Sequence, residues 1–202
     1  MVLSKSLRRD RRGNAIVELA IGLPVLIMLM FGVVTGGLIF DRYMTVVQLA
    51  RTGASVFSRG ADFSVTANKN LLLLGSEALG MTATGGNGVM YLTRIQLSPP
   101  GGSNAGQLVI AERHVIGDPA FHASYVGTPN SQIWPDPDEP LPNGLVDDRN
   151  NQSTAIATVP ATLNTLPLGE SMFVVEVYHR SSELRFGNVW GNSALMASKV
   201  YF

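Results

Sequence analysis

A long apolar segment near the N-terminus limits what this chain can fold into more than any other feature. From Leu19 to Phe40 there are twenty-two residues without a charge, and only Thr35 is plainly polar. As an α-helix this run is roughly 33 Å long, which matches the hydrocarbon core of a bilayer. The sequence therefore predicts a transmembrane helix, which we assign to residues 14–40.

A secretory signal peptide is the main alternative for such a segment. Its apolar region would be about 7–15 residues long and would end at a small-residue cleavage site. The run here is longer, so we expect the chain to stay anchored. The positive-inside rule places the N-terminus in the cytoplasm and residues 41–202 outside the inner membrane, because five basic residues precede the run: Lys5, Arg8, Arg9, Arg11 and Arg12.

The composition suits one outer domain that does not bind nucleic acid. About 160 residues follow the helix, which is enough for one hydrophobic core. The chain has 15 basic and 15 acidic residues, and beyond Gly13 it keeps 10 basic and 14 acidic ones, a net charge of −4. Nucleic-acid-binding domains show a basic face instead. The chain has no cysteine, which excludes disulfides and thiolate chemistry.

Past Phe40 the pattern predicts that the helix continues as an amphipathic stalk over residues 41–60. Its apolar face holds Val46, Val47, Ala50, Ala54 and Phe57, and its polar face holds Thr45, Gln48, Thr52, Ser55 and Arg59. A second helix is predicted after the stalk, ending at Gly80. Its expected buried face holds Ala67, Leu71, Leu74 and Ala78.

From Val89 onward the period changes from helical to twofold, which indicates strands. Between the predicted strands lies an irregular region, Asp118 to Pro167, that holds eight of the eleven prolines and allows one short strand at Ala155–Val159. Residues 61–202 are therefore expected to form an α+β domain, with an antiparallel sheet of three to five strands and a long Pro-rich loop. The main predicted strands are Val89–Leu97, Gln107–Ile116, Met172–Arg180 and Ser193–Phe202.

Glu18 is a lone carboxylate at the edge of the apolar run. A carboxylate at the centre of a spanning helix costs on the order of 3 kcal/mol, so Glu18 either has a partner or reaches the interface near Arg12. Gly13 follows the basic cluster, and Glu18 is the fifth residue after it. This spacing resembles the type IV prepilin signal, in which a membrane-embedded prepilin peptidase cuts after the glycine.

The prepilin resemblance implies a role for three residues. Cleavage between Gly13 and Asn14 would create an α-amino group at Asn14, and Glu18 of a neighbouring subunit can neutralise it. The pair would set the register between packed helices. Residues 1–13 would then be a basic leader.

The more detailed resemblance is to the TadE-like minor pilins, or pseudopilins, of the tight-adherence (Flp/Tad) pilus system. It covers residues 8–54 and depends on the stretch Arg11 to Ala20, on Leu23-Pro24, and on Ala50-Arg51-Thr52-Gly53-Ala54. Leu19 stands where the major Flp pilin has an aromatic residue, which favours a minor subunit. Asn14 stands where ordinary type IV pilins have phenylalanine, which disfavours those relatives.

That resemblance implies a structural protein of the inner membrane and no cofactor. Its expected partners are the prepilin peptidase, the pilus assembly platform and other minor pilins, with the major Flp pilin as a further candidate.

Pro24 would remove one helical hydrogen bond and is expected to kink the helix. Gly32 and Gly36 form a Gly-xxx-Gly pair that would let another helix approach closely.

Catalytic and metal-binding readings find little support. No Walker loop, dinucleotide fingerprint, nucleophile elbow or zinc-protease motif occurs. The three histidines, His114, His122 and His179, are scattered, and Glu176 and His179 point to opposite faces of one predicted strand. The acidic loop from Trp134 to Asp148 does not follow the EF-hand order of calcium ligands, so a solvated loop is the preferred interpretation.

Three functional hypotheses follow. The first is a minor pilin processed after Gly13 that acts in pilus assembly and surface adherence. The second is a permanently anchored extracytoplasmic binding domain or adhesin, in which the spacing of Gly13 and Glu18 is accidental. The third, an anchored hydrolase, is disfavoured by the missing motifs.

Overall fold

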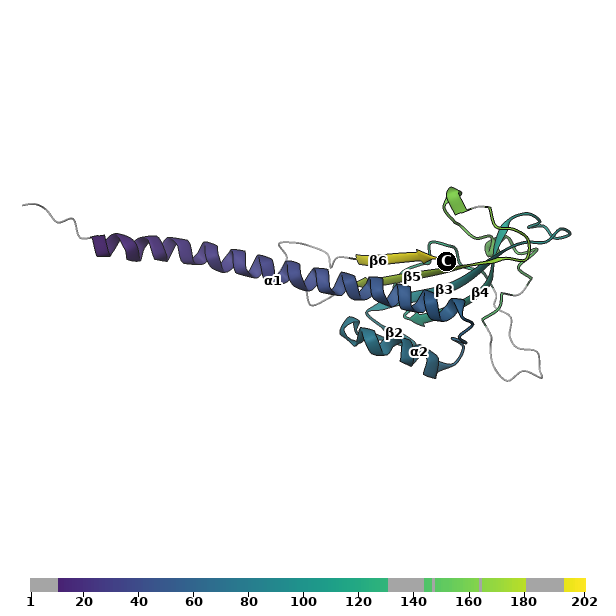
Figure 1. The fold of residues 1–202 in the computed structure, drawn as a ribbon, viewed down its shortest axis with the longest axis horizontal. Coiled ribbons are helices and arrows are strands. Elements are labelled where there is room, and N and C mark those ends of the chain that lie inside the picture. Colours follow the sequence, from purple (N-terminus) through teal and green to yellow (C-terminus); the bar gives the residue numbers. More distant parts are fainter. Residues whose placement is uncertain (1–10, 131–143, 147, 164, 181–194) are drawn as a thin grey trace, which may run out of the picture. The chain divides into compact units, whose positions relative to one another are not determined.

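The structure, a computed structural model, describes residues 11–130, 144–146, 148–163, 165–180 and 195–202. The chain divides into two units, Met1–Asp41 and Arg42–Phe202. Helix α1, Arg11–Ser58, runs through the boundary between them (Figure 1). The prediction that the helix continues past Phe40 is therefore confirmed. Helix α1 begins at Arg11, so the last three residues of the predicted leader are helical.

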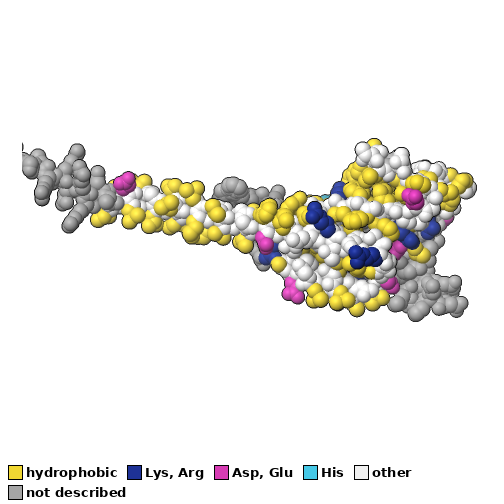
Figure 2. Space-filling model, viewed as in Figure 1, with side chains coloured by type: hydrophobic (Ala, Val, Ile, Leu, Met, Phe, Trp, Pro, Cys, Tyr) yellow, Lys and Arg dark blue, Asp and Glu magenta, His cyan; other side chains and the backbone are white. Residues whose placement is uncertain are grey.

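The part of α1 in the first unit has an exposed apolar surface. Its hydrophobic side chains are 38–76% exposed from Ile16 to Phe40, and they cover this helix in Figure 2. The helix is long and apolar enough to cross a membrane, with a mean hydropathy of 2.4 and no buried residue in the most apolar stretch. Water is a poor solvent for such a surface, which suits a bilayer or other helices.

The second unit has a four-stranded antiparallel sheet in the order β4-β3-β5-β6 (Figure 1). Its strands are β3 (Gly88–Leu97), β4 (Leu108–Gly117), β5 (Ser171–Arg180) and β6 (Leu195–Tyr201). The number of strands in this sheet falls within the expected range of three to five. The α+β prediction is confirmed. A two-stranded ribbon, β1 (Met81–Thr82) and β2 (Gly85–Gly86), precedes the sheet.

One face of the sheet is covered by the end of α1 and by the short helices that follow it. These are α2 (Thr66–Leu73) and the 3₁₀ helix η1 (Leu74–Leu79), which ends at Gly80 in the left-handed conformation, with φ of 61°. Most of the predicted apolar face of α1 packs here: Val46, Ala50, Ala54 and Phe57 are buried, whereas Val47 is half-buried. Strand residues Met90, Leu92, Val175 and Val177 complete this core.

The predicted buried face of the second helix is wrong. Leu71 and Leu74 are 65% and 63% exposed, and Ala67 and Ala78 are exposed as well. The buried side chains are instead Leu72, Leu73, Ser76 and Leu79. A run of four leucines at residues 71–74 fits more than one helical face, so periodicity does not decide between them.

The opposite, outer face of the sheet is covered by irregular chain. Part of it is an apolar core of Ile95, Ile110, Val126, Val146 and Val174, with other residues around them. The predicted strand Ala155–Val159 is replaced by a 3₁₀ turn, η2 (Ser153–Ala155), and a single bridge from Ile156 to Val109. A second 3₁₀ turn, η3, spans Ala161–Leu163. The centre of the predicted Pro-rich loop lies outside the described residues.

Candidate functional site

The motif Ala50-Arg51-Thr52-Gly53-Ala54 has a structural explanation for its small residues. Ala50 and Ala54 are fully buried where α1 lies on the sheet. At Gly53, an added Cβ would lie 2.1 Å from Cε of Met90 on β3 and 3.6 Å from Cδ2 of Leu72 on α2. These residues therefore let α1 approach its neighbours closely, while Arg51 and Thr52 are exposed.

The predicted processing and register residues all lie in α1. Gly13 and Asn14 are within its first turn, and the structure does not describe their side chains. Glu18 follows one turn later and is exposed, among apolar side chains that are also exposed. Among the side chains that the structure describes, which in α1 begin at Ile16, Glu18 has no ion-pair partner, so a partner for its charge would have to come from elsewhere.

The Gly-xxx-Gly pair is equally open. A Cβ added at Gly32 or Gly36 would meet no heavy atom within 4 Å, and the same holds at Gly37. The Thr35 hydroxyl donates a hydrogen bond to the Phe31 carbonyl at 2.8 Å, which satisfies the polar side chain inside the helix. The helix runs on past Pro24, and the predicted kink there stays a prediction.

The outer sheet face holds a buried carboxylate that sequence reasoning did not connect to any partner. Glu176 on β5 is fully buried. One of its oxygens accepts hydrogen bonds from the Tyr125 backbone N–H at 3.0 Å and from the Tyr178 hydroxyl at 2.8 Å. The other accepts one from the Ser124 hydroxyl. Three donors are thus aimed at one carboxylate, as a charged form requires in a buried site.

Arg113 on β4 is the opposite charge of this cluster and is 3% exposed. Its guanidinium donates to the hydroxyls of Thr93 and Ser124, at 3.1–3.2 Å, and to the Gly127 carbonyl. Ser124 therefore bridges the two buried ions. Burial lowers the pKa of Arg113 to about 10, against the attraction of Glu176, which raises it. The two ions together fasten residues 118–127 to the sheet.

Two tyrosines complete the cluster. The Tyr91 hydroxyl donates to the His122 carbonyl at 2.6 Å, and the Tyr178 ring stacks on the His122 ring with centroids 4.0 Å apart. Burial raises the pKa of both tyrosines above the ordinary range, and for Tyr178 the hydrogen bond to Glu176 raises it further. The arrangement is a satisfied structural network, since each of the donors named above has an acceptor.

The histidines are not gathered into one site. His114 is buried on the α1 face, against the edges of Phe57 and Phe63, with Nε2 2.8 Å from the Glu112 carboxylate. His122 lies on the outer face. In the described ranges there is no group of three or more His, Asp and Glu side chains that could hold a metal. Most of the acidic loop from Trp134 to Asp148 lies outside those ranges.

These features define a class of protein: a chain with a helix able to span a membrane, the one such helix among the described residues, whose last turns form part of the core of an α+β domain. The family model described as TadE-like protein matches residues 13–55. The matched segment begins at Gly13 and ends just after Ala54. The resemblance to TadE-like proteins is confirmed for this segment and supports a protein related to the Tad pilus. No curated protein and no solved structure matches the chain.

Proposed function

We propose that this chain is a minor pilin or pseudopilin of a Flp/Tad-type pilus, processed by a prepilin peptidase after Gly13. Its helix joins or primes the pilus, and its outer domain meets other minor subunits during pilus assembly and surface adherence. The observation that carries the proposal is the TadE-like match over residues 13–55, which starts at the glycine of the prepilin-type signal.

The exposed apolar helix supports an assembly role. Its large apolar side chains are exposed from Ile16 to Phe40, and Glu18 is exposed among them. A packed bundle of such helices would bury the apolar surface, and Gly32 and Gly36 would allow close approach. A new α-amino group at Asn14 of one subunit would neutralise Glu18 of the next. The role is structural, with the chain as a substrate of the peptidase and not itself an enzyme.

The proposed location follows from the basic N-terminus. Residues 1–13 lie in the cytoplasm, residues 14–40 cross the inner membrane, and residues 41–202 lie in the extracytoplasmic space. The partners are the prepilin peptidase, the assembly platform and other minor pilins. The major Flp pilin is a further partner if the processed chain enters the filament.

Mass spectrometry of the full chain from native membranes tests the processing step. We expect an N-terminus at Asn14 in cells that contain the peptidase, and at Met1 in cells that lack it. A chain that keeps Met1 in both strains would contradict processing and favour the permanently anchored binding domain or adhesin. A Gly13→Leu variant is the matched control, because a bulky residue at the cut should block cleavage without changing the apolar run.

The role of Glu18 is tested separately from processing. Glu18→Ala should leave membrane insertion and cleavage intact but reduce piliation and adherence at least about tenfold, since one unneutralised α-amino charge would stay in the helix bundle. Ile21→Ala, on an equally exposed neighbour of the same helix, is the control and should assemble normally. Normal piliation by Glu18→Ala would refute the register role.

A further inference from the structure

The two edges of the four-stranded sheet differ in whether other segments of the chain form hydrogen bonds with their backbone groups. At the β4 edge, the chain's own segments satisfy backbone groups along the whole strand. Ala157 N–H donates to the Leu108 carbonyl, Val146 N–H to the Ala111 carbonyl, and Arg113 N–H to the Gly144 carbonyl, at 2.8–3.0 Å. Farther along, Lys69 Nζ donates to the Val115 carbonyl at 3.0 Å. This edge is closed to further pairing.

The β6 edge presents its backbone to the outside. Phe173 and Phe202 exchange both backbone hydrogen bonds, at 2.8 and 2.9 Å, so they are a hydrogen-bonded pair. In an antiparallel ladder such pairs alternate with pairs whose N–H and C=O groups point away. Counting along the register of β5 and β6, the outward groups belong to Leu195, Ala197, Lys199 and Tyr201. The residues that the structure describes place no hydrogen-bond partner against them.

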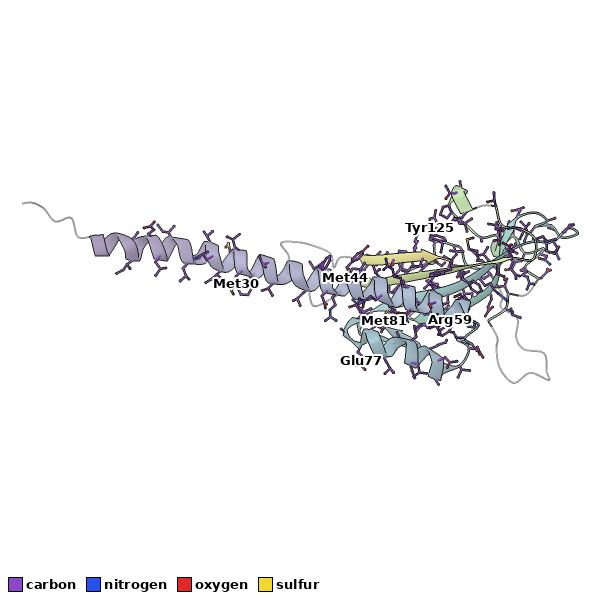
Figure 3. All side chains as sticks on the ribbon, viewed as in Figure 1. Met30, Met44, Arg59, Glu77, Met81 and Tyr125 are labelled. Atoms are coloured by element: carbon purple, nitrogen blue, oxygen red, sulfur yellow. The ribbon has the colours of Figure 1, made fainter. Side chains whose placement is uncertain are left out.

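Lys199 is the charged residue of this edge strand, and its side chain is directed away from the edge. A lysine on an edge strand normally discourages pairing, because its charge projects past the strand. Here the Lys199 ammonium lies 3.6 Å from the centroid of the Tyr125 ring, over the outer face of the sheet. Tyr125 is labelled above the sheet in Figure 3. The cation–π contact therefore holds the charge back and leaves the backbone of β6 accessible.

We propose that the free edge of β6 is a strand-addition site, which binds an extended segment of a second, different protein chain. Backbone hydrogen bonds to the four outward residues would supply affinity, and alternate side chains of the segment would supply selectivity. The proposal does not depend on processing at Gly13, and it applies equally to a permanently anchored domain.

A second copy of this chain does not fit the site. The direction of α1 relative to β3 follows from two contacts. Gly53 lies against Met90 of β3, and the Phe57 ring meets the Phe173 ring edge-on, where Phe173 pairs with Arg94 of β3. Residue numbers therefore increase in the same direction along α1 and β3. Antiparallel pairing of two β6 strands about a twofold axis would bring residues 42–58 of the two copies into their domains from opposite ends. Copies whose helices pack side by side in the same direction would enter from the same end. The alternative, β6 against β4 of another copy, is blocked because that edge is closed.

The exposed side chains of β6 define the chemistry of the partner segment. Leu195 is 42% exposed, and Tyr201 is partly exposed at the other end of the strand. Lys199 lies between them. A segment with an apolar residue near each end and a carboxylate opposite Lys199 would gain cross-strand contacts at all three positions, whereas a basic residue there would be repelled.

Hydrogen exchange on the intact chain tests the proposal. The exchange rates of the Ala197 and Lys199 amides are compared in native membranes and in membranes of a host that makes only this chain. We expect exchange at least about tenfold slower in native membranes, because a bound strand protects these amides. The Ser198 amide, which faces β5, is the internal control and should not change. Exchange of these amides that is equally fast in both membranes would overturn the proposal. Exchange that is equally slow in both would overturn it as well, because protection would then not need a second protein.

Substitution at one outward amide gives a second readout. Ala197→Pro removes an N–H that β5 does not use, so an edge strand tolerates it. We expect Ala197→Pro to lose the native-membrane protection of Lys199 while its unfolding temperature stays within about 3 °C of the parent chain. Ala197→Ser keeps the N–H and should behave as the parent. Ala197→Cys tests self-pairing in this cysteine-free chain, and a disulfide-linked homodimer would contradict a different partner.

Discussion

Replacing Glu176 should destabilise the sheet domain more than any single change at its surface. Glu176→Ala removes the acceptor of three hydrogen bonds, one buried and two partly buried, and the counter-charge of Arg113. A buried donor left unsatisfied costs about 1–3 kcal/mol, and a buried charge left without its compensating charge costs about 3–5 kcal/mol. Because these contributions overlap, we expect the free energy of unfolding to fall by about 3–5 kcal/mol.

The measurement is thermal unfolding of the purified full chain in detergent, followed by circular dichroism. For a domain of this size about 1 kcal/mol corresponds to 2–4 °C, so the unfolding temperature should fall by roughly 6–20 °C. Glu77→Ala is the matched control. Glu77 is an exposed carboxylate on η1, labelled in Figure 3, and its loss should change the temperature by less than about 2 °C.

A double-mutant cycle separates the charge interaction between Glu176 and Arg113 from the hydrogen bonds of Glu176. Arg113→Met alone should also destabilise, but adding it to Glu176→Gln should cost less than the sum of the two single changes, since it removes the uncompensated buried charge. An unfolding temperature for Glu176→Ala within about 2 °C of the parent would refute the reasoning. It would mean that residues 118–127 are held by other contacts.

Three further changes test other parts of the structure. The pKa of Tyr178 is raised from its ordinary value of 10, so its contribution to stability is full below pH 10 and is lost as the pH rises further. The free energy of unfolding measured with urea should therefore decrease less steeply above pH 10 in Tyr178→Phe than in the parent chain. Leu72→Ala should cost about 2–4 kcal/mol in the same assay, whereas the exposed Leu71→Ala should cost less than about 1 kcal/mol; equal costs would contradict the observed face of α2. Gly117→Ala, with φ of 98° and a Cβ 2.3 Å from the Gly88 carbonyl, should lower the unfolding temperature by several degrees more than Gly101→Ala, where φ is 112° and the space is open.

Periodicity predicted most of the elements in this chain. The continuation of α1 to Ser58 and the four strands follow from apolar residues at helical or twofold spacing, as at Val46, Ala50 and Ala54. The face of α2 did not follow, because a leucine run gives no unique face. The sheet decides which leucines are buried, and that contact depends on residues far away in the chain.

The cluster on the outer face could not be predicted from spacing. Glu176 stands out as a charge between valines, which is a signal that it needs a buried partner. Its partners, however, come from β4 and from a loop more than fifty residues earlier, and no local rule joins them. The small residues of the Ala50 to Ala54 motif, in contrast, are part of the family resemblance, and the close approach of Gly53 to Met90 gives their physical reason.

The sharing of one helix between anchor and core has a mechanical consequence. The buried residues Val46, Ala50, Ala54 and Phe57 belong to the same helix as the apolar segment, so tension that is carried along α1 acts on the sheet through packed side chains. Displacing α1 would expose the buried side chains of Met90 and Val175 to solvent. The domain would therefore resist extension, because the whole apolar interface between α1 and the sheet would have to separate at once.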